Sequence, residues 1–134
     1  TGAQPVLVDI TDDYTIDLDD LARKAADSGA RVLLLSHMRG HIADMARVTA
    51  RCRELGLTLV EDCAHTMGAG WDGRLTGSFG VAGCFSLQSY KHANAGEGGL
   101  LVTDDGDLAA QAILMSGSYA LYGAHLARPD EAVL

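Results

Sequence analysis

The stretch RVLLLSHMRGHIADMARVTARCRELGLTLVE, residues 31–61, decides the fold class. It starts with the apolar run Arg31–Ser36, continues with a helical pattern over Ile42–Leu55, and closes with a second apolar run, Leu57–Glu61. Gly56 follows the last periodic residue, where glycine is a frequent helix cap. Two short apolar strands joined by a helix of this length predict a parallel βαβ unit, because a parallel connection must cross the sheet.

The same alternation extends to both sides of this unit. Further strands are predicted at Pro5–Ile10, Gly83–Leu87 and Gly99–Thr103, and further helices at Asp17–Ser28 and Asp107–Met115. The first helix opens with acidic residues and is followed by Gly29, which suits both of its ends. The pattern predicts an α/β fold with a mostly parallel sheet and helices on both faces. The tail Ser116–Leu134 is too irregular to assign.

Composition and charge limit the function classes. The chain has 134 residues, of which 48% are hydrophobic and 21% charged, so it fits one folded domain rather than a disordered segment. Ten basic and 18 acidic residues give a net charge of −8, and the basic residues form no cluster. We therefore expect no nucleic acid and no membrane surface among its partners. No apolar run approaches the roughly 20 residues of a membrane helix.

The N-terminus and the cysteines bear on where in the cell the protein is expected. Thr1–Pro5 lacks the basic and apolar regions of a signal peptide, and because the chain begins without Met we expect that residues preceded it. The spacing of Cys52, Cys63 and Cys84 suits neither a zinc ribbon nor a disulfide framework. We expect reduced thiols in a cytoplasmic protein.

Two motifs imitate known binding sites. Gly68–Gly73 matches the dinucleotide fingerprint G-x-G-x-x-G, but further glycines follow at once, so no helix can start there to hold a pyrophosphate. Asp72-Gly73 is better explained as a tight turn between two short extended pieces. His37 and His41 have the separation of a zinc pair, yet Gly40 between them makes a shared helical turn a poor explanation.

Polar residues follow three of the predicted strands, at the edge where α/β sheets bind ligands. A lysine that forms a Schiff base needs a neutral amine, and Lys91 lies between a buried strand and a glycine-rich run. A pyridoxal ring acts as an electron sink when a carboxylate faces its ring nitrogen, and Asp62 can supply that carboxylate. Ser86 can donate to a cofactor phosphate, and His65 can contact the ring or its phenolic oxygen.

Each of these residues also has an ordinary structural explanation. A lysine after a strand is commonly a solvated loop residue, an aspartate a turn cap, a histidine a satisfied polar group and a serine a strand-end hydroxyl. Two hypotheses follow. One is a pyridoxal-phosphate enzyme, and the alternative is a non-catalytic α/β domain or split relative that acts as a binding module.

The ordered motifs resemble a known family. Six segments of the chain are similar to the motifs of the DegT/DnrJ/EryC1/StrS aminotransferases: Gly40–Met45, Val60–His65, Gly77–Gly80, Gly83–Ser86, Lys91 and Gly96–Gly99. The resemblance extends from about Pro5 to about Met115. It implies part of the large domain of a fold-type-I enzyme that depends on pyridoxal 5′-phosphate.

The resemblance also implies roles for four residues. Lys91 corresponds to the lysine that forms the internal aldimine and transfers the proton, and Asp62 to the partner of the pyridinium nitrogen. His65 takes the place often held by Gln beside the ring, and Ser86 that of a phosphate contact. A dehydratase branch of the family has His in place of the lysine, so Lys91 favours transamination. The implied reaction moves an amino group from an amino-acid donor, commonly glutamate, to a keto acceptor, commonly a nucleotide-linked keto-sugar.

Parts of the family pattern are missing from the chain. The phosphate cup and a stacking aromatic ring normally precede Pro5, and a small C-terminal domain follows. We therefore expect residues 1–134 to be a single partial domain, the second half of the cofactor-binding domain. The resemblance implies a homodimer. Leu114–Tyr119 departs from the Arg and His-Gly or Asn-Gly of many sugar aminotransferases, and no role follows for Asn94 or Glu97.

Overall fold

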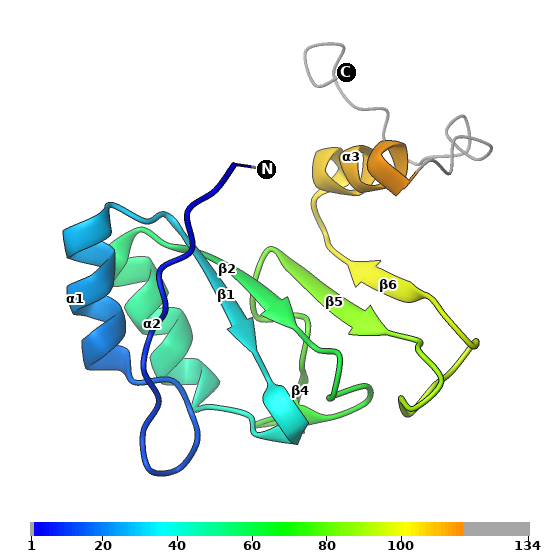
Figure 1. Ribbon diagram of the computed structural model, residues 1–134, viewed down its shortest axis with the longest axis horizontal. Helices are drawn as coiled ribbons and strands as arrows, with labels where there is room; N and C mark the ends of the chain where they lie inside the picture. Colours follow the sequence, from blue (N-terminus) through cyan, green and yellow to red (C-terminus); the bar gives the residue numbers. More distant parts are fainter. Residues whose placement is uncertain (1, 117–134) are drawn as a thin grey trace.

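The computed structural model describes residues 2–116 (Figure 1). The helices are α1 (Leu18–Ser28), α2 (Met45–Leu55) and α3 (Gly106–Ser116), with a short 3₁₀-helix, η1 (Met38–Gly40). The strands are β1 (Val32–Ser36), β2 (Thr58–Asp62), β3 (Gly70–Trp71), β4 (Arg74–Leu75), β5 (Ala82–Ser86) and β6 (Gly99–Val102). Residues 117–134, which make up nearly all of the unassigned tail, lie outside the described residues.

Four strands form the main sheet in the order β1-β2-β5-β6. The strands β1, β2 and β5 are parallel, with Leu33 opposite Leu59 and Glu61 opposite Gly83. The fourth strand, β6, runs antiparallel to β5. The mostly parallel α/β sheet predicted from the sequence is therefore confirmed.

The helices α1 and α2 begin and end at the residues that the sequence marks. Asp17 caps α1 by accepting hydrogen bonds from two backbone amides of its first turn, and Asp44 caps α2 through one. Gly29 and Gly56 end the two helices with φ of 69° and 65°, in the left-handed region that favours glycine.

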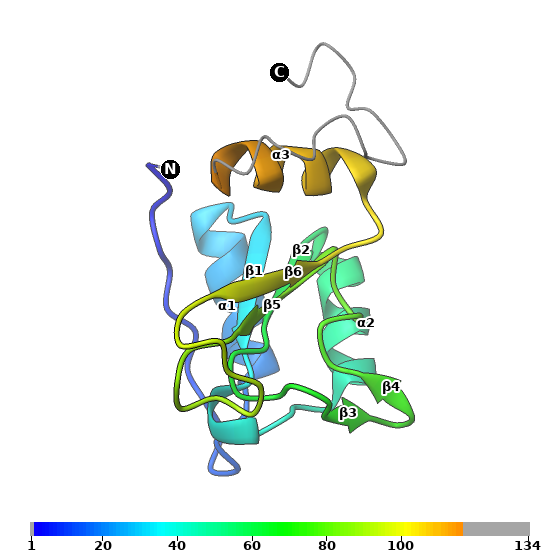
Figure 2. The same cartoon turned by 90° about the vertical axis from the view of Figure 1, so that its right-hand side faces the viewer.

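The core lies between one face of the sheet and these two helices. Leu33 and Leu35 of β1 and Leu59 of β2 alternate onto that face, where they are buried with Leu21 of α1 and Val48 of α2. In Figure 2 the third helix, α3, lies beyond one end of the strands, away from α1 and α2. It contacts β6.

The opposite face of β1 is open among the described residues. Val32 and Leu34 point to that face and are 60% and 66% exposed. The described helices therefore do not cover both faces of this strand, and in this respect the structure differs from the prediction.

The predicted strand at Pro5–Ile10 is wrong. Only an isolated bridge between Ile10 and Ile16 forms there. The segment runs alongside α1 instead, where Lys24 Nζ donates to the carbonyl of Leu7 at 2.6 Å and the amide of Asp9 donates to Asp20 at 2.8 Å. Its backbone groups are thus bonded by helix side chains rather than by a neighbouring strand, a distinction that apolar composition does not reveal.

The glycine-rich segment after β2 forms a hairpin. Gly70 pairs with Leu75 and Trp71 with Arg74, and the turn between them has Asp72 and Gly73 at φ of 49° and 77°. Positive φ at both central residues is typical of a tight hairpin turn. This confirms the tight turn predicted for Asp72-Gly73.

Two further features bear on context. Cys52, Cys63 and Cys84 are all free thiols, and the first two are buried. Among residues 2–116, the helices are too short and not apolar enough to span a bilayer.

Candidate active site

Three parallel strands end side by side on polar residues. Ser36, Asp62 and Ser86 are the last residues of β1, β2 and β5. Ser36 is the register partner of Asp62, and Asp62 that of Cys84, two residues before Ser86. Because side chains alternate along a strand, all of these point to one face, opposite to the face of the buried Leu35. The structure thus brings two of the four predicted site residues to one edge of one face.

The Asp62 carboxylate is held by two hydrogen bonds. The Ser36 hydroxyl donates to Oδ2 at 2.9 Å, and the amide of Ala64 donates to Oδ1 at 3.1 Å. Asp62 is half-buried, so part of its surface stays open to a ligand. These contacts orient the carboxylate without neutralising its charge.

His65 follows β2 in a turn and contacts the loop after β1. The backbone amide of Arg39 donates to its Nδ1 at 2.9 Å. Since a backbone amide can only donate, Nδ1 must be the unprotonated nitrogen and the proton of the neutral ring is on Nε2. His65 can therefore present an N–H donor to a ligand.

Ser86 and Lys91 lie where β5 gives way to a long loop. Ser86 Oγ accepts a hydrogen bond from the amide of Gln88 at 3.3 Å, and the amide of Lys91 donates to the carbonyl of Gln88 at 2.9 Å. Lys91 is half-buried. Among residues 2–116 no hydrogen bond or ion pair involves Lys91 Nζ, so the structure places the lysine in the loop leaving the edge without joining it to Asp62, His65 or Ser86.

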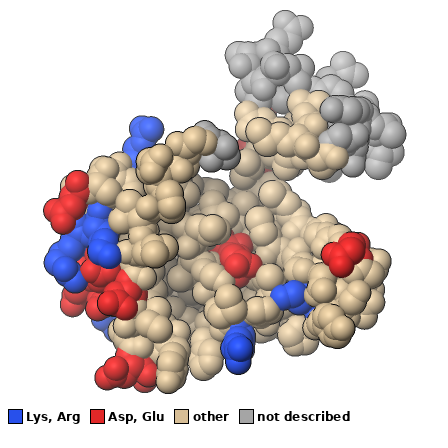
Figure 3. Space-filling model, in the orientation of Figure 1, with Lys and Arg blue, Asp and Glu red and all other residues tan. Residues whose placement is uncertain are grey.

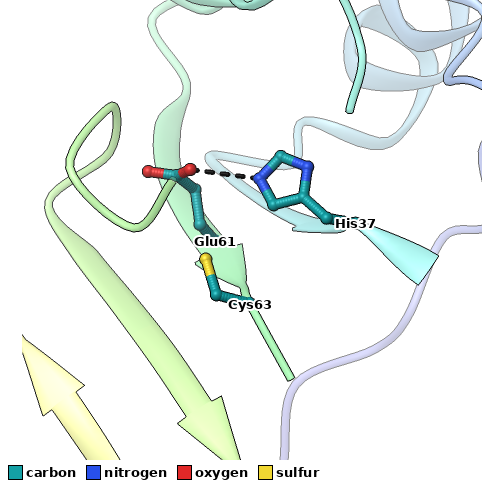
Figure 4. A group of neighbouring side chains, drawn as sticks. All are labelled: His37, Glu61 and Cys63. Carbon is teal, nitrogen blue, oxygen red and sulfur yellow. Dashed lines mark hydrogen bonds and ion pairs between the residues drawn. The ribbon is translucent and has the colours of Figure 1, made fainter. Parts of the chain in front are cut away.

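A buried carboxylate lies on the other face of β2. Glu61 is fully buried, and Figure 4 shows its side chain meeting that of His37 beside Cys63. His37 Nε2 donates to Glu61 Oε2 at 3.1 Å. The amides of Gly77, Phe79 and Gly80 also donate to the carboxylate, at 2.9, 2.6 and 2.9 Å.

These bonds decide the charge of Glu61. Burial by itself raises the pKa of this carboxyl, but the hydrogen bonds from His37 and from the three amides more than offset it, and the pKa lies below its ordinary value. Glu61 is therefore an ionised carboxylate inside the protein. It ties the end of β1 and the loop before β5 to β2.

The same contacts explain the spacing of the glycines at 77, 80 and 83. A Cβ at Gly80 would lie 2.3 Å from the carbonyl oxygen of Leu59, and one at Gly83 would lie 2.3 Å from Cα of Gly77. Backbone therefore packs directly on backbone here, and the loop amides can reach Glu61. The glycine motif builds a binding site for an internal carboxylate.

His37, Glu61 and Cys63 offer ligand atoms within 4.8 Å of one another, which raises the question of a metal. Burial raises the pKa of the Cys63 thiol to about 11, whereas metal binding requires the thiolate. Both oxygens of Glu61 already accept hydrogen bonds. The chemistry of the three groups fits a hydrogen-bonded structural cluster.

Sequence reasoning missed the roles of Ser36, Glu61 and Arg39. Ser36 is the last residue of β1, and its polar character was a usable signal for the site, whereas Glu61 lies one residue before the end of β2. The partner of Glu61 is a loop 16 to 19 residues away, and the partner of Arg39 lies 26 residues away, so no local pattern reveals either contact. Asn94 and Glu97 are exposed.

Comparison with known proteins adds to this geometry. Residues 1–121 match the model of the DegT/DnrJ/EryC1/StrS aminotransferase family. L-glutamine:scyllo-inosose aminotransferase of Streptomyces griseus is 46% identical over 112 residues, which are 83% of this chain and 26% of that protein. The chain therefore spans about a quarter of the length of this relative.

Two solved structures show the fold. The structure of DesI in the presence of its TDP-sugar product matches with a TM-score of 0.77 and 37% identity, over 91% of this chain and 31% of DesI. The GDP-4-keto-6-deoxy-D-mannose-3-dehydratase of E. coli, with bound hydrated PLP, matches with a TM-score of 0.73 and 27% identity, over 90% and 30% of the two chains. The chain has the α/β fold of fold-type-I aminotransferases.

The residues at the edge fit the cofactor of such enzymes. Pyridoxal 5′-phosphate needs a carboxylate for its ring nitrogen, hydroxyl donors for its phosphate and a primary amine for its aldehyde. Asp62, Ser86 and Lys91 carry a carboxylate, a hydroxyl and a primary amine, and Asp62 and Ser86 share one face. The match over residues 1–121 shows that the chain belongs to the DegT/DnrJ/EryC1/StrS aminotransferase family.

Proposed function

We propose that the protein is a pyridoxal-phosphate-dependent aminotransferase. It transfers an amino group from an amino-acid donor to a keto acceptor, a nucleotide-linked keto-sugar or a related metabolite. The observation that carries the proposal is the placement of Asp62 and Ser86 on one face of adjacent strand ends, with Lys91 in the loop that follows. The relatives named for scyllo-inosose and for a TDP-sugar product support this class of acceptor.

Each residue has a defined task in this proposal. When bound, the cofactor supplies an electron sink that weakens the C–H bond of the amino substrate. Asp62, held by Ser36, keeps the ring nitrogen protonated. His65 donates from Nε2 to the phenolic oxygen, and Ser86 donates its hydroxyl to the phosphate. Lys91 would hold the cofactor through Nζ, and its amine would act as the general base and acid that moves the substrate proton.

Lysine at position 91 bears on the reaction type. The matched structures include a dehydratase as well as aminotransferases. By the family resemblance the dehydratases have His where this chain has Lys91. A primary amine at this position supports transamination.

The proposal extends to the assembly around the chain. Residues 1–134 form the second half of the cofactor-binding domain, as the family resemblance implies, and they match 31% of DesI. The protein acts as a homodimer, which the unpaired outer edges of β1 and β6 among the described strands support. It works in the cytoplasm, consistent with three free thiols. Size-exclusion chromatography of the full protein and cell fractionation test these two points.

Chemical trapping tests the site. The protein is incubated with pyridoxal 5′-phosphate, reduced with borohydride and mapped by peptide mass spectrometry, with Lys91→Ala as the control variant. We expect one adduct in this segment, on Lys91. Lys24, the other lysine of the segment, is an internal control because its Nζ binds the Leu7 carbonyl at 2.6 Å and lies 3.6 Å from Asp20. Equal labelling of both lysines, or none, supports the non-catalytic binding module instead.

A further inference from the structure

Arg39 has an unusual backbone conformation beside the proposed active site. It lies in η1, directly after β1, with φ of 56° and ψ of 20°. Among residues 2–116 two other non-glycine residues have positive φ, Tyr14 in the loop before α1 and Asp72 in the turn between β3 and β4. A non-glycine residue in this region carries strain, and such strain often marks a functional position.

Two sets of hydrogen bonds hold Arg39 in place. Its amide donates to His65 Nδ1 at 2.9 Å. On either side, the amide of Gly40 donates to the carbonyl of His37 at 3.1 Å, and the amide of His41 donates to that of Met38 at 3.2 Å. The backbone of Arg39 is thereby tied to a residue that we assign to the cofactor.

The guanidinium of Arg39 is available to a ligand. The side chain is exposed and lines a groove of about 1140 Å³, together with Ser36, whose hydroxyl binds Asp62. The groove therefore reaches the site edge. Among residues 2–116 no carboxylate pairs with Arg39, whereas Arg74 of β4 is bound to Ser78 and lies over the ring of Phe79.

The charge around the groove sets Arg39 apart. Figure 3 shows charged side chains gathered over α1, whereas the surface over the N-terminal segment and the sheet is mostly uncharged. Lys24, the other basic residue lining the groove, is occupied by the Leu7 carbonyl and Asp20. Arg39 is thus the unpaired cation of the groove among the described residues.

We propose that Arg39 binds an anionic oxygen group of the substrate, either the carboxylate of the amino donor or a phosphate of the nucleotide-linked acceptor. The proposal rests on the proposed function. A guanidinium presents two parallel N–H donors that match a carboxylate or a phosphate. The strained backbone then serves to aim the side chain at the substrate.

The test uses the full-length protein loaded with pyridoxal 5′-phosphate. Arg39→Asn removes the guanidinium but keeps the amide that binds His65, and Asn tolerates the left-handed conformation. Arg39→Lys keeps the charge and loses the two-pronged donor. Arg53→Asn, the same change at an exposed arginine in the last turn of α2, is the matched control. Isothermal titration with glutarate and with dTDP reports on carboxylate and phosphate separately.

We expect Arg39→Asn to raise the dissociation constant of one probe at least about tenfold, with a smaller rise in Arg39→Lys and none in Arg53→Asn. A rise for glutarate identifies the donor carboxylate, and a rise for dTDP identifies the acceptor phosphate. The proposal is overturned if both probes bind Arg39→Asn within about twofold of Arg53→Asn, or if the wild type binds neither. Borohydride labelling of Lys91 on the same samples shows separately whether the proposed function holds.

Discussion

The carboxylate of Glu61 joins three segments that are distant in the sequence. It accepts one hydrogen bond from His37 and three from the loop at residues 77–80, while the next residue, Asp62, points to the opposite face. Any shift of Glu61 therefore moves β2 at the residue that faces the proposed cofactor. The buried hydrogen bonds of Glu61 therefore help to fix the position of Asp62, the next residue in the chain.

Replacing Glu61 by Gln should loosen this loop. The amide group cannot accept all four hydrogen bonds, so we expect a local loss of about 2 kcal/mol and about 30-fold faster hydrogen exchange at the amides of residues 77–80. Hydrogen exchange followed by mass spectrometry measures this, with the amides of β1 as the internal reference. Unchanged protection of the loop in the variant would contradict the role of Glu61.

The ionised state of Glu61 also predicts a dependence on pH. Its pKa in the folded protein is below the ordinary value of 4.5, so the unfolded state binds the proton more readily. The stabilisation from Glu61 is present above that value and is lost as the pH falls through the folded pKa. Urea denaturation from pH 7 to pH 3 should show a shallower loss of stability in Glu61→Gln than in the wild type. If the two proteins lost the same stability as the pH fell, the result would contradict a stabilising, ionised Glu61.

At this scale the sequence predicts only part of the site. Asp62 and Ser86 follow from their places at the ends of apolar runs, because parallel strands end at one edge. Glu61 and Arg39 act through contacts with residues 16 to 26 positions away, which depend on how the strands pair. Such contacts have no local signature.

Among the elements, β5 and the loop before it pack so closely that no side chain fits between them at Gly83. Gly83→Ala would place a Cβ 2.3 Å from Cα of Gly77, a backbone atom that cannot rotate away. We expect a loss of about 3 kcal/mol or more in the free energy of unfolding, measured by urea denaturation. Gly29→Ala is the control, since it has a φ of 69° but nothing within 4 Å, and should cost only about 1 kcal/mol. Equal losses of stability in the two variants would contradict the role of close packing at Gly83.

The sequence predicted most elements that have a regular apolar pattern, and Pro5–Ile10 is the exception. The helices α1 and α2 and four strands of the main sheet lie within a few residues of their predicted bounds because caps and apolar runs mark them. Pro5–Ile10 has the same apolar character, yet its backbone bonds to Lys24 and Asp20 rather than to a strand. A β-strand forms only when a neighbouring strand supplies hydrogen-bond partners, and the sequence of a segment does not show whether such a neighbour is present.

The whole molecule leaves two sheet edges and one apolar face open. Among the described strands, β1 and β6 have no partner on their outer sides. Val32 and Leu34 on β1 and Leu101 on β6 are 60%, 66% and 43% exposed. Open edges with apolar side chains favour pairing with further strands. Relatives that are about three times as long as this chain have residues to supply such strands.

Expressed alone, the segment 1–134 should therefore associate with itself. We expect sedimentation velocity at about 50 μM to show dimers or larger species, because each copy offers two free edges. A lysine at an edge opposes such pairing, so Val32→Lys together with Leu101→Lys should shift the segment toward monomer. Leu75→Lys changes a residue of similar exposure, 62%, in the separate hairpin sheet and should leave the association unchanged. A monomeric wild-type segment, or an equal effect of the hairpin variant, would mean that the main sheet is complete by itself.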